Sequence, residues 1–160
     1  MQESSKDEVY LRHAIALAKK GVQNKDGGPF GAVIVRHGDV IAEGNNMVTS
    51  TNDPTAHAEI VAIRRACETL LSFQLTDCVL YSSCEPCPMC LGAIYWSRLS
   101  RLVFACTRED AADIDFDDAF LYKEIVQPVN LRAIQTEQML REEGLEAFRM
   151  WENFADKIAY

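Results

Sequence analysis

The feature that most constrains the fold of this chain is the run Ser-Ser-Cys-Glu-Pro-Cys-Pro-Met-Cys at positions 82–90. Its cysteines, Cys84, Cys87 and Cys90, follow one another at intervals of three residues. In chains that are not exported, cysteines at this density bind metal or act in catalysis more often than they form disulfides. The other cysteines have apolar neighbours and are expected to be small core side chains; these are Cys67, Cys78 and Cys106.

A second motif begins upstream, with a histidine thirty residues before Cys87. The octapeptide Asp-Pro-Thr-Ala-His-Ala-Glu-Ile, positions 53–60, places His57 and Glu59 two residues apart at the expected start of a helix. Downstream, Pro86 precedes the Cys-x-x-Cys pair. Together, His-x-Glu and Pro-Cys-x-x-Cys form a signature that is typical of zinc-dependent nucleobase deaminases.

The spacing of these residues indicates where a metal ion can lie. Cys87 and Cys90 share one face of a helix, and a helix N-terminus favours their thiolate forms. His57 and Glu59 are about 200° apart around a helix, so they can converge only near its N-terminal end. We therefore expect the metal between the starts of two helices.

The three expected ligands, His57, Cys87 and Cys90, suit zinc, with one ion per subunit and a fourth position left open for catalysis. Glu59 is then not a ligand but carries protons between water, the substrate ring and the departing ammonia. Cys84 leaves an alternative, because as a fourth ligand it could close a structural site. The chain must turn directly after Cys84, and this favours the open site with Cys84 packed beside it.

Helical and strand patterns alternate along the chain. Helices are expected at 8–21, 57–71 and 88–97 and from residue 141 onward. Strands are expected at 32–35, 40–43, 79–82, 101–105 and 131–138. This alternation predicts a single domain over residues 1–160, with the α/β fold of a three-layer α/β/α sandwich around a central mixed five-stranded sheet.

Charge and hydropathy narrow the class of substrate. The net charge is −8, and no basic run is longer than Lys19-Lys20 or Arg64-Arg65. Nucleic-acid binding relies on basic side chains that neutralise phosphates, so a small neutral substrate is favoured over a polynucleotide.

No segment approaches the ~20 apolar residues of a membrane span, and the polar N-terminal residues lack a signal-peptide pattern. We therefore expect a cytoplasmic protein without membrane contact.

Four stretches closely resemble the bacterial guanine deaminases of the cytidine deaminase-like superfamily: GGPFGAVIV, DPTAHAEI, SSCEPCPMCLGAIYWSR and FDDAF. The resemblance covers nearly the whole chain. It implies a cytidine deaminase-like fold and the zinc-dependent hydrolysis of guanine, a purine base, to xanthine and ammonia. The zinc motif is shared with cytosine, cytidine and tRNA-adenosine deaminases, so the narrowing to guanine depends on FDD, the asparagine pair at 45–46 and the chain end.

The same resemblance implies roles for residues outside the zinc motif. Asn46 corresponds to the asparagine that hydrogen-bonds the base, and Phe30 to the aromatic side chain that packs on it. Ala58 would offer backbone polar groups to the ring. Asp118 corresponds to a second catalytic carboxylate beside the exocyclic amine, although from spacing alone its acidic neighbourhood is typical of a solvated face.

The resemblance also implies a domain-swapped homodimer. In the family, the C-terminal segment, about residues 141–160 here, crosses to the neighbouring subunit. The terminal tyrosine, Tyr160, would then cap the partner's pocket.

Alternative functions stay open at this stage. A purine nucleoside deaminase of the guanosine type differs only in having room for ribose. A tRNA-adenosine deaminase should carry a basic C-terminal tail, whereas the tail of this chain is acidic. A cytosine or cytidine deaminase is a further alternative, because these enzymes share the zinc motif. A non-catalytic zinc-binding module would need a closed site or a missing proton carrier, whereas Glu59 is present.

Overall fold

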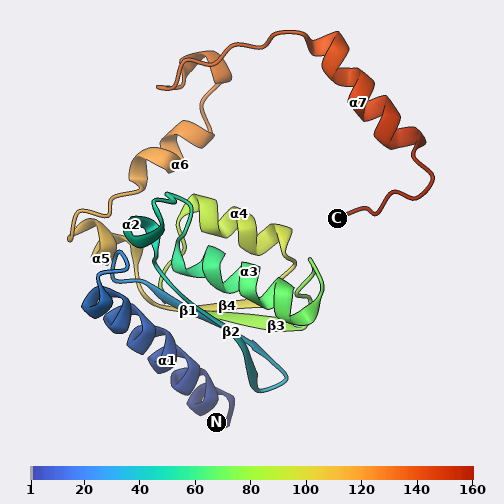
Figure 1. The fold of residues 1–160 in the computed structure, drawn as a ribbon. Coiled ribbons are helices and arrows are strands. Elements are labelled where there is room, and N and C mark those ends of the chain that lie inside the picture. Colours follow the sequence, from blue (N-terminus) through green and yellow to red (C-terminus); the bar gives the residue numbers. More distant parts are fainter. Residues whose placement is uncertain (1) are drawn as a thin grey trace. The chain divides into compact units, whose positions relative to one another are not determined.

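The computed structural model of the chain describes residues 2–160, with side chains from residue 6 onward (Figure 1). The chain forms two compact units, Met1–Asp118 and Ala119–Tyr160. The first unit contains the sheet and the signature motifs. The second contains the C-terminal helices.

The first unit is built on a four-stranded mixed sheet in the order β2-β1-β3-β4. Its strands are β1 (Gly31–Arg36), β2 (Asp39–Asn45), β3 (Cys78–Cys84) and β4 (Arg101–Cys106). β1 pairs antiparallel with both β2 and β3, whereas β3 and β4 are parallel. Parallel neighbours need a crossover connection, and α4 (Pro88–Trp96) supplies it.

Helices cover both faces of this sheet and give three layers. As Figure 1 shows, α1 (Gln2–Asn24) lies on one face, and α3 (Ala58–Leu70) and α4 lie on the other. Successive residues of a strand point to opposite faces, so Val33 packs with Ala14 of α1, whereas Ile34 is buried with Ala62 of α3 and Ile94 of α4. The expected α/β/α sandwich is confirmed.

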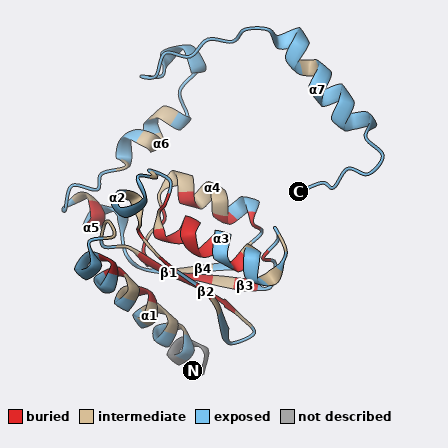
Figure 2. Cartoon of the chain, viewed as in Figure 1, coloured by how far each residue is buried: buried red, intermediate tan, exposed pale blue. Residues whose placement is uncertain are grey.

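Close approach between backbones sets the position of α3. A Cβ atom on Gly44 of β2 would collide with the carbonyl oxygen of Ala58, the first residue of that helix. Glycine at this position therefore lets the N-terminal end of α3 lie directly against the sheet. Figure 2 shows that the buried residues of α3 gather in its N-terminal part.

Most expected elements are present, with ends within two residues of the expected positions, while α1 is longer than expected. The prediction of a fifth strand at 131–138 is wrong. Val129–Leu131 is a 3₁₀ turn, and residues 132–140 contain neither helix nor strand. A strand is stabilised by hydrogen bonds to a neighbouring strand. The described residues of the second unit include no other strand with which this segment could pair. The cysteine at the end of β4, Cys106, is exposed rather than buried.

Short helices follow the ends of the strands. α2 (Val48–Thr51) follows β2, and α5 (Arg108–Ala112) follows β4. Helix α5 begins after Thr107 because Thr107 and Asp110 form a capping box. In this box each side chain accepts a hydrogen bond from the other residue's backbone N–H.

The second unit contains α6 (Ala119–Ile125) and α7 (Arg141–Asn153). Its apolar side chains are largely exposed, including Phe148 at 71% and Met150 at 74%; in Figure 2 both helices are mostly pale blue. Among the described residues, no helix is both long enough and apolar enough to cross a membrane.

Candidate metal centre and active site

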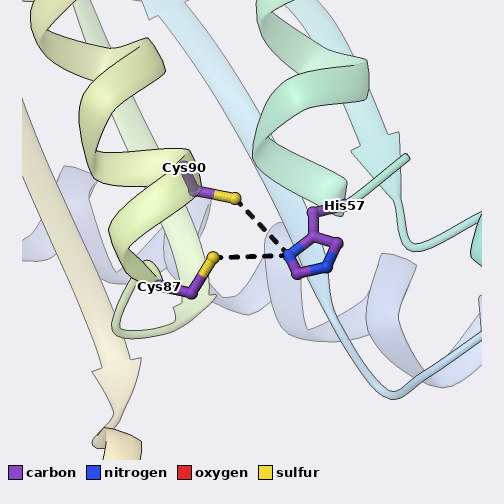
Figure 3. Close-up of side chains that lie close together, drawn as sticks. All are labelled: His57, Cys87 and Cys90. Carbon is purple, nitrogen blue, oxygen red and sulfur yellow. Dashed lines mark hydrogen bonds between the residues drawn. The ribbon is translucent and has the colours of Figure 1, made fainter. Parts of the chain in front are cut away.

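The three expected metal ligands come from the N-terminal ends of two helices. His57 is the residue before α3 and Cys87 the residue before α4, and both have extended backbone angles. Cys90 lies in the first turn of α4 and is buried. Figure 3 shows the imidazole and both sulfurs pointing toward one another from the two helix starts.

The distances within this cluster fit a zinc ion. The Nδ1 atom of His57 lies 3.6 Å from the Sγ atom of Cys87 and 3.6 Å from that of Cys90. With tetrahedral coordination and ordinary Zn–N and Zn–S bond lengths, such ligand atoms lie about 3.5 Å apart. Among the residues that the structure describes, this is the one group of three or more His, Cys, Asp or Glu residues whose ligand atoms all lie within 4.8 Å of one another.

The electrostatics of the cluster also suit a divalent cation. A hydrogen bond from Cys90, followed by one from His57, lowers the pKa of the Cys87 thiol to about 4. The same contact with Cys87, together with burial, raises the pKa of Cys90. The hydrogen bond to Cys87 likewise raises the pKa of His57. Thiolate and neutral imidazole are the forms that bind metal, so zinc binding releases the protons held within this cluster.

Glu59 lies in the first turn of α3, beside the cluster but not in it. The side chain is 6% exposed, and burial raises its pKa. Its Oε2 atom lies 3.5 Å from the Sγ atom of Cys90, and its Oε1 atom accepts a hydrogen bond from Ser82 at 3.3 Å. A buried carboxyl that holds its proton more readily than usual is suited to general acid–base work.

Cys84 does not join the cluster. It ends β3, and its thiol is turned toward Thr107, to whose carbonyl oxygen it donates at 3.4 Å. Burial raises the pKa of this thiol to about 12, so it is the protonated, packed cysteine of the motif. The arrangement fits an open, three-ligand site rather than a closed one.

Asn46 is buried in the loop after β2, and its amide oxygen is already occupied. Its Oδ1 atom accepts hydrogen bonds from the backbone N–H groups of Gly28 and Val48, each at 3.2 Å. A Cβ atom on Gly27 would collide with the same oxygen, which explains the first glycine of the GGPFG loop. Because two N–H donors fix the orientation of the amide, its NH₂ group is the part that can donate to a ligand.

Phe30 and Ala58 hold mainly structural contacts in this chain. The ring of Phe30 is half-buried, packs against the core cluster, and meets the ring of Phe116 edge to face at 5.0 Å. Ala58 is fully buried at the start of α3. Ala58 directly follows His57, and the backbone carbonyl of Phe30 accepts a hydrogen bond from the N–H of Asn46 at 2.9 Å, so both residues lie beside expected site residues.

Asp118, the last residue of the first unit, is half-buried. Burial, and then the nearby charge of Cys87, raise the pKa of its carboxyl. Tyr160 belongs to the second unit, where its side chain is 71% exposed.

Sequence reasoning missed two residues of this region. Phe116, which supports Phe30, is the phenylalanine of the FDD stretch, so its proximity to Asp118 was the signal that could have found it. Ser82 lies inside the cysteine-rich run itself, but nothing in its local sequence indicates a contact with Glu59.

A mixed α/β/α sandwich with an open His/Cys/Cys site at two helix N-termini defines a zinc-dependent deaminase. The chain belongs to the cytidine and deoxycytidylate deaminase family, whose zinc-binding region matches residues 4–106. It is 55% identical over 153 residues to the guanine deaminase of Bacillus subtilis (strain 168), a match that covers 96% of this chain and 98% of that protein. The X-ray structure of guanine deaminase from Bacillus subtilis superimposes with a TM-score of 0.93 and covers the same shares of the two chains.

Two further relatives are more distant. A guanine deaminase from Nitrosomonas europaea has a TM-score of 0.66 and 31% identity, covering 88% of this chain and 71% of that one. The tRNA-specific adenosine deaminase of Bacillus subtilis is 41% identical over 100 residues, which is 62% of each protein.

Proposed function

We propose that this chain hydrolyses guanine to xanthine and ammonia, using one zinc ion per subunit. The observation that carries the proposal is the extent of the similarity. The match with the Bacillus subtilis guanine deaminase covers 96% of this chain at 55% identity, whereas the match with the tRNA-specific enzyme covers 62%. A net charge of −8 also favours a small base over a polyanionic tRNA.

In the reaction, the exocyclic C–N bond of guanine is replaced by a C–O bond from water, and ammonia leaves. His57, Cys87 and Cys90 would hold the zinc ion, which would supply the Lewis acidity that makes water a nucleophile near neutral pH. Glu59 takes a proton from the attacking water and delivers it to a ring nitrogen, because its buried carboxyl has a raised pKa. Asp118, with its pKa also raised by burial, helps protonate the departing amine.

The remaining contacts orient the base. The NH₂ group of Asn46 donates to an acceptor on the ring edge, since the amide oxygen is occupied by Gly28 and Val48. Phe30 packs against the flat face of the purine, with its own ring fixed by Phe116. Backbone polar groups at Ala58 complete the recognition of the ring.

We further propose that the active form is a homodimer in which residues of about 141–160 are exchanged, so that Tyr160 closes the partner's pocket. The exposure of this segment supports an exchange. Its apolar side chains would otherwise remain in water, and contiguous exposed apolar surface is characteristic of interaction sites. The large apolar side chains of this segment that are at least 54% exposed are Phe148, Met150, Phe154, Ile158 and Tyr160.

The decisive experiment is ammonia release from guanine, guanosine, adenine, cytosine, cytidine and tRNA, measured side by side with purified zinc enzyme. We expect turnover of guanine to exceed that of every other substrate. Faster release from guanosine would assign a nucleoside deaminase. Zinc binding without release from any substrate would assign a non-catalytic module.

A further inference from the structure

Ser82 is a polar residue at an interior position of the sheet. It lies on β3, with Ala32 of β1 and Phe104 of β4 as its register partners on either side. The side chain is 1% exposed and points to the same face as Leu80, toward α3. A hydroxyl buried in this way must be hydrogen-bonded, or it destabilises the fold.

The partner of this hydroxyl is the proposed proton carrier. Ser82 Oγ donates to Oε1 of Glu59 at 3.3 Å, although the two residues are separated by 23 positions in the sequence. It also accepts from the backbone N–H of Cys84 at 3.4 Å, which fixes the direction in which the hydroxyl donates.

The two oxygens of the Glu59 carboxyl therefore have different neighbours. Oε1 is held by the floor of the sheet through Ser82, whereas Oε2 lies 3.5 Å from the Sγ atom of Cys90 and faces the metal cluster. One hydrogen bond at Oε1 stops the carboxyl from rotating about its last torsion angle, which is otherwise soft. The oxygen that faces the cluster is then the one presented to water and substrate.

We propose that Ser82 is a positioning residue for catalysis: its hydroxyl fixes the Glu59 carboxyl so that Oε2 is the oxygen that transfers protons. This inference rests on the proposed function, because it takes Glu59 as the proton carrier. Ser82 itself does not touch the substrate. A well-positioned acid–base group accelerates reaction through alignment, so losing the hydroxyl lowers kcat and leaves KM nearly unchanged.

The test compares Ser82→Ala and Ser82→Thr with Ser97→Ala as a matched control. Ser97 is also buried, and its hydroxyl donates to a backbone carbonyl within α4, that of Ile94. We expect Ser82→Ala to lower kcat for guanine about 10-fold. This is the lower end of the effects expected when a hydrogen bond to a charged group is lost, because the contact between Ser82 and Glu59 is long. Zinc content should stay at one ion per subunit, and Ser97→Ala should keep wild-type kcat.

Two further measurements separate positioning from a general packing defect. Ser82→Thr adds a methyl group to a filled site, yet it keeps the hydroxyl and should retain more activity than Ser82→Ala. In a Glu59→Gln background, Ser82→Ala should cost nothing more, because the group it positions is already gone. Multiplying effects in the double mutant, an unchanged kcat in Ser82→Ala, or an unfolded or zinc-free Ser82→Ala protein would each overturn the inference. Wild-type enzyme that releases no ammonia from guanine would instead overturn the proposed function.

Discussion

Oε2 of Glu59 lies 3.5 Å from the Sγ atom of Cys90, although the two side chains come from different helices. The approach is produced by the N-terminal ends of α3 and α4 meeting over the sheet, and it brings a buried carboxyl beside the His57–Cys87–Cys90 cluster without making it a ligand. This placement leaves the Glu59 carboxyl unligated, as the proposed proton carrier requires.

Glu59→Gln tests that separation of roles. The amide keeps the shape of the side chain but cannot carry a proton, so kcat for guanine should fall about 10³-fold. Zinc content should remain one ion per subunit, because the three ligand side chains are intact. The matched control is Glu68→Gln on the exposed side of the same helix, which should keep wild-type kinetics. Rapid turnover in Glu59→Gln would mean that another group carries the proton.

The open site predicts that the three cysteines of the motif differ in their effect on metal content. Cys87→Ser should lower bound zinc well below one ion per subunit, because thiolate is replaced by a poor ligand. Cys84→Ala should keep its zinc, since this thiol points to Thr107. Metal content by atomic spectroscopy after dialysis decides the matter. Loss of zinc from Cys84→Ala would show a four-ligand, closed site.

Chelation provides the corresponding test of the metal itself. Enzyme stripped of zinc should lose at least 10²-fold in turnover and regain it on addition of zinc, because water is a poor nucleophile near neutral pH without a Lewis acid. The measurement is ammonia release from guanine before and after reconstitution. Full activity in metal-free protein would contradict the role assigned to the cluster.

The metal cluster could be predicted from the sequence because its chemistry is local. Cys87 and Cys90 share a helix turn, and His57 stands directly before a helix, so each ligand's direction follows from helix geometry alone. The three layers of the fold could also be predicted, because the alternation of strands and helices is visible in the local sequence pattern.

The parts that were not predicted depend on distant pairing. The segment 131–138 was expected to be a strand, but a strand forms only where another strand pairs with it, and none does here. The contact between Ser82 and Glu59 links β3 to α3 across 23 residues, and a serine in an apolar strand carries no local sign of such a partner.

Asp118→Asn examines the second carboxyl. Burial and the charge of Cys87 raise the pKa of Asp118, so it is suited to give a proton to the departing amine. We expect kcat to fall at least 10-fold with zinc content unchanged. Asp113→Asn, an exposed neighbour at the end of α5, serves as the control. Equal kinetics in the two variants would identify Asp118 as part of a solvated acidic surface.

The exchanged tail can be tested by complementation between two defective chains. One chain carries Glu59→Gln and an intact C-terminus, and the other keeps Glu59 but lacks Tyr160. If each tail closes the partner's pocket, a mixed dimer contains one complete site. Refolding or co-expressing the chains together should then restore about a quarter of wild-type activity with random pairing. No gain over the separate chains would place Tyr160 in its own subunit's pocket, or outside any pocket.

Asp7 predicts a pH dependence of stability. Its carboxylate accepts from Arg101 at 2.6 and 3.0 Å and from the hydroxyl of Tyr81 at 2.7 Å, tying α1 to β4 and β3. The Arg101 hydrogen bonds, and then that of Tyr81, lower the pKa of Asp7. The ionised form therefore stabilises the fold above the unfolded-state pKa of about 3.9, and this contribution is lost as pH falls through the lower folded-state pKa.

At pH 7, Asp7→Asn should reduce the free energy of unfolding by about 1 kcal/mol, a modest value because Arg101 is half exposed. The difference between wild type and variant should shrink as pH falls from about 4 toward 2, because the wild-type carboxylate becomes protonated. Urea denaturation at several pH values measures it. Glu8→Gln is the control, since its partner Arg12 and Glu8 itself are both exposed, and it should change stability by less than about 0.5 kcal/mol. A difference for Asp7→Asn that stays constant over this pH range would mean that packing of the side chain, rather than its charge, stabilises the junction of α1 with the sheet.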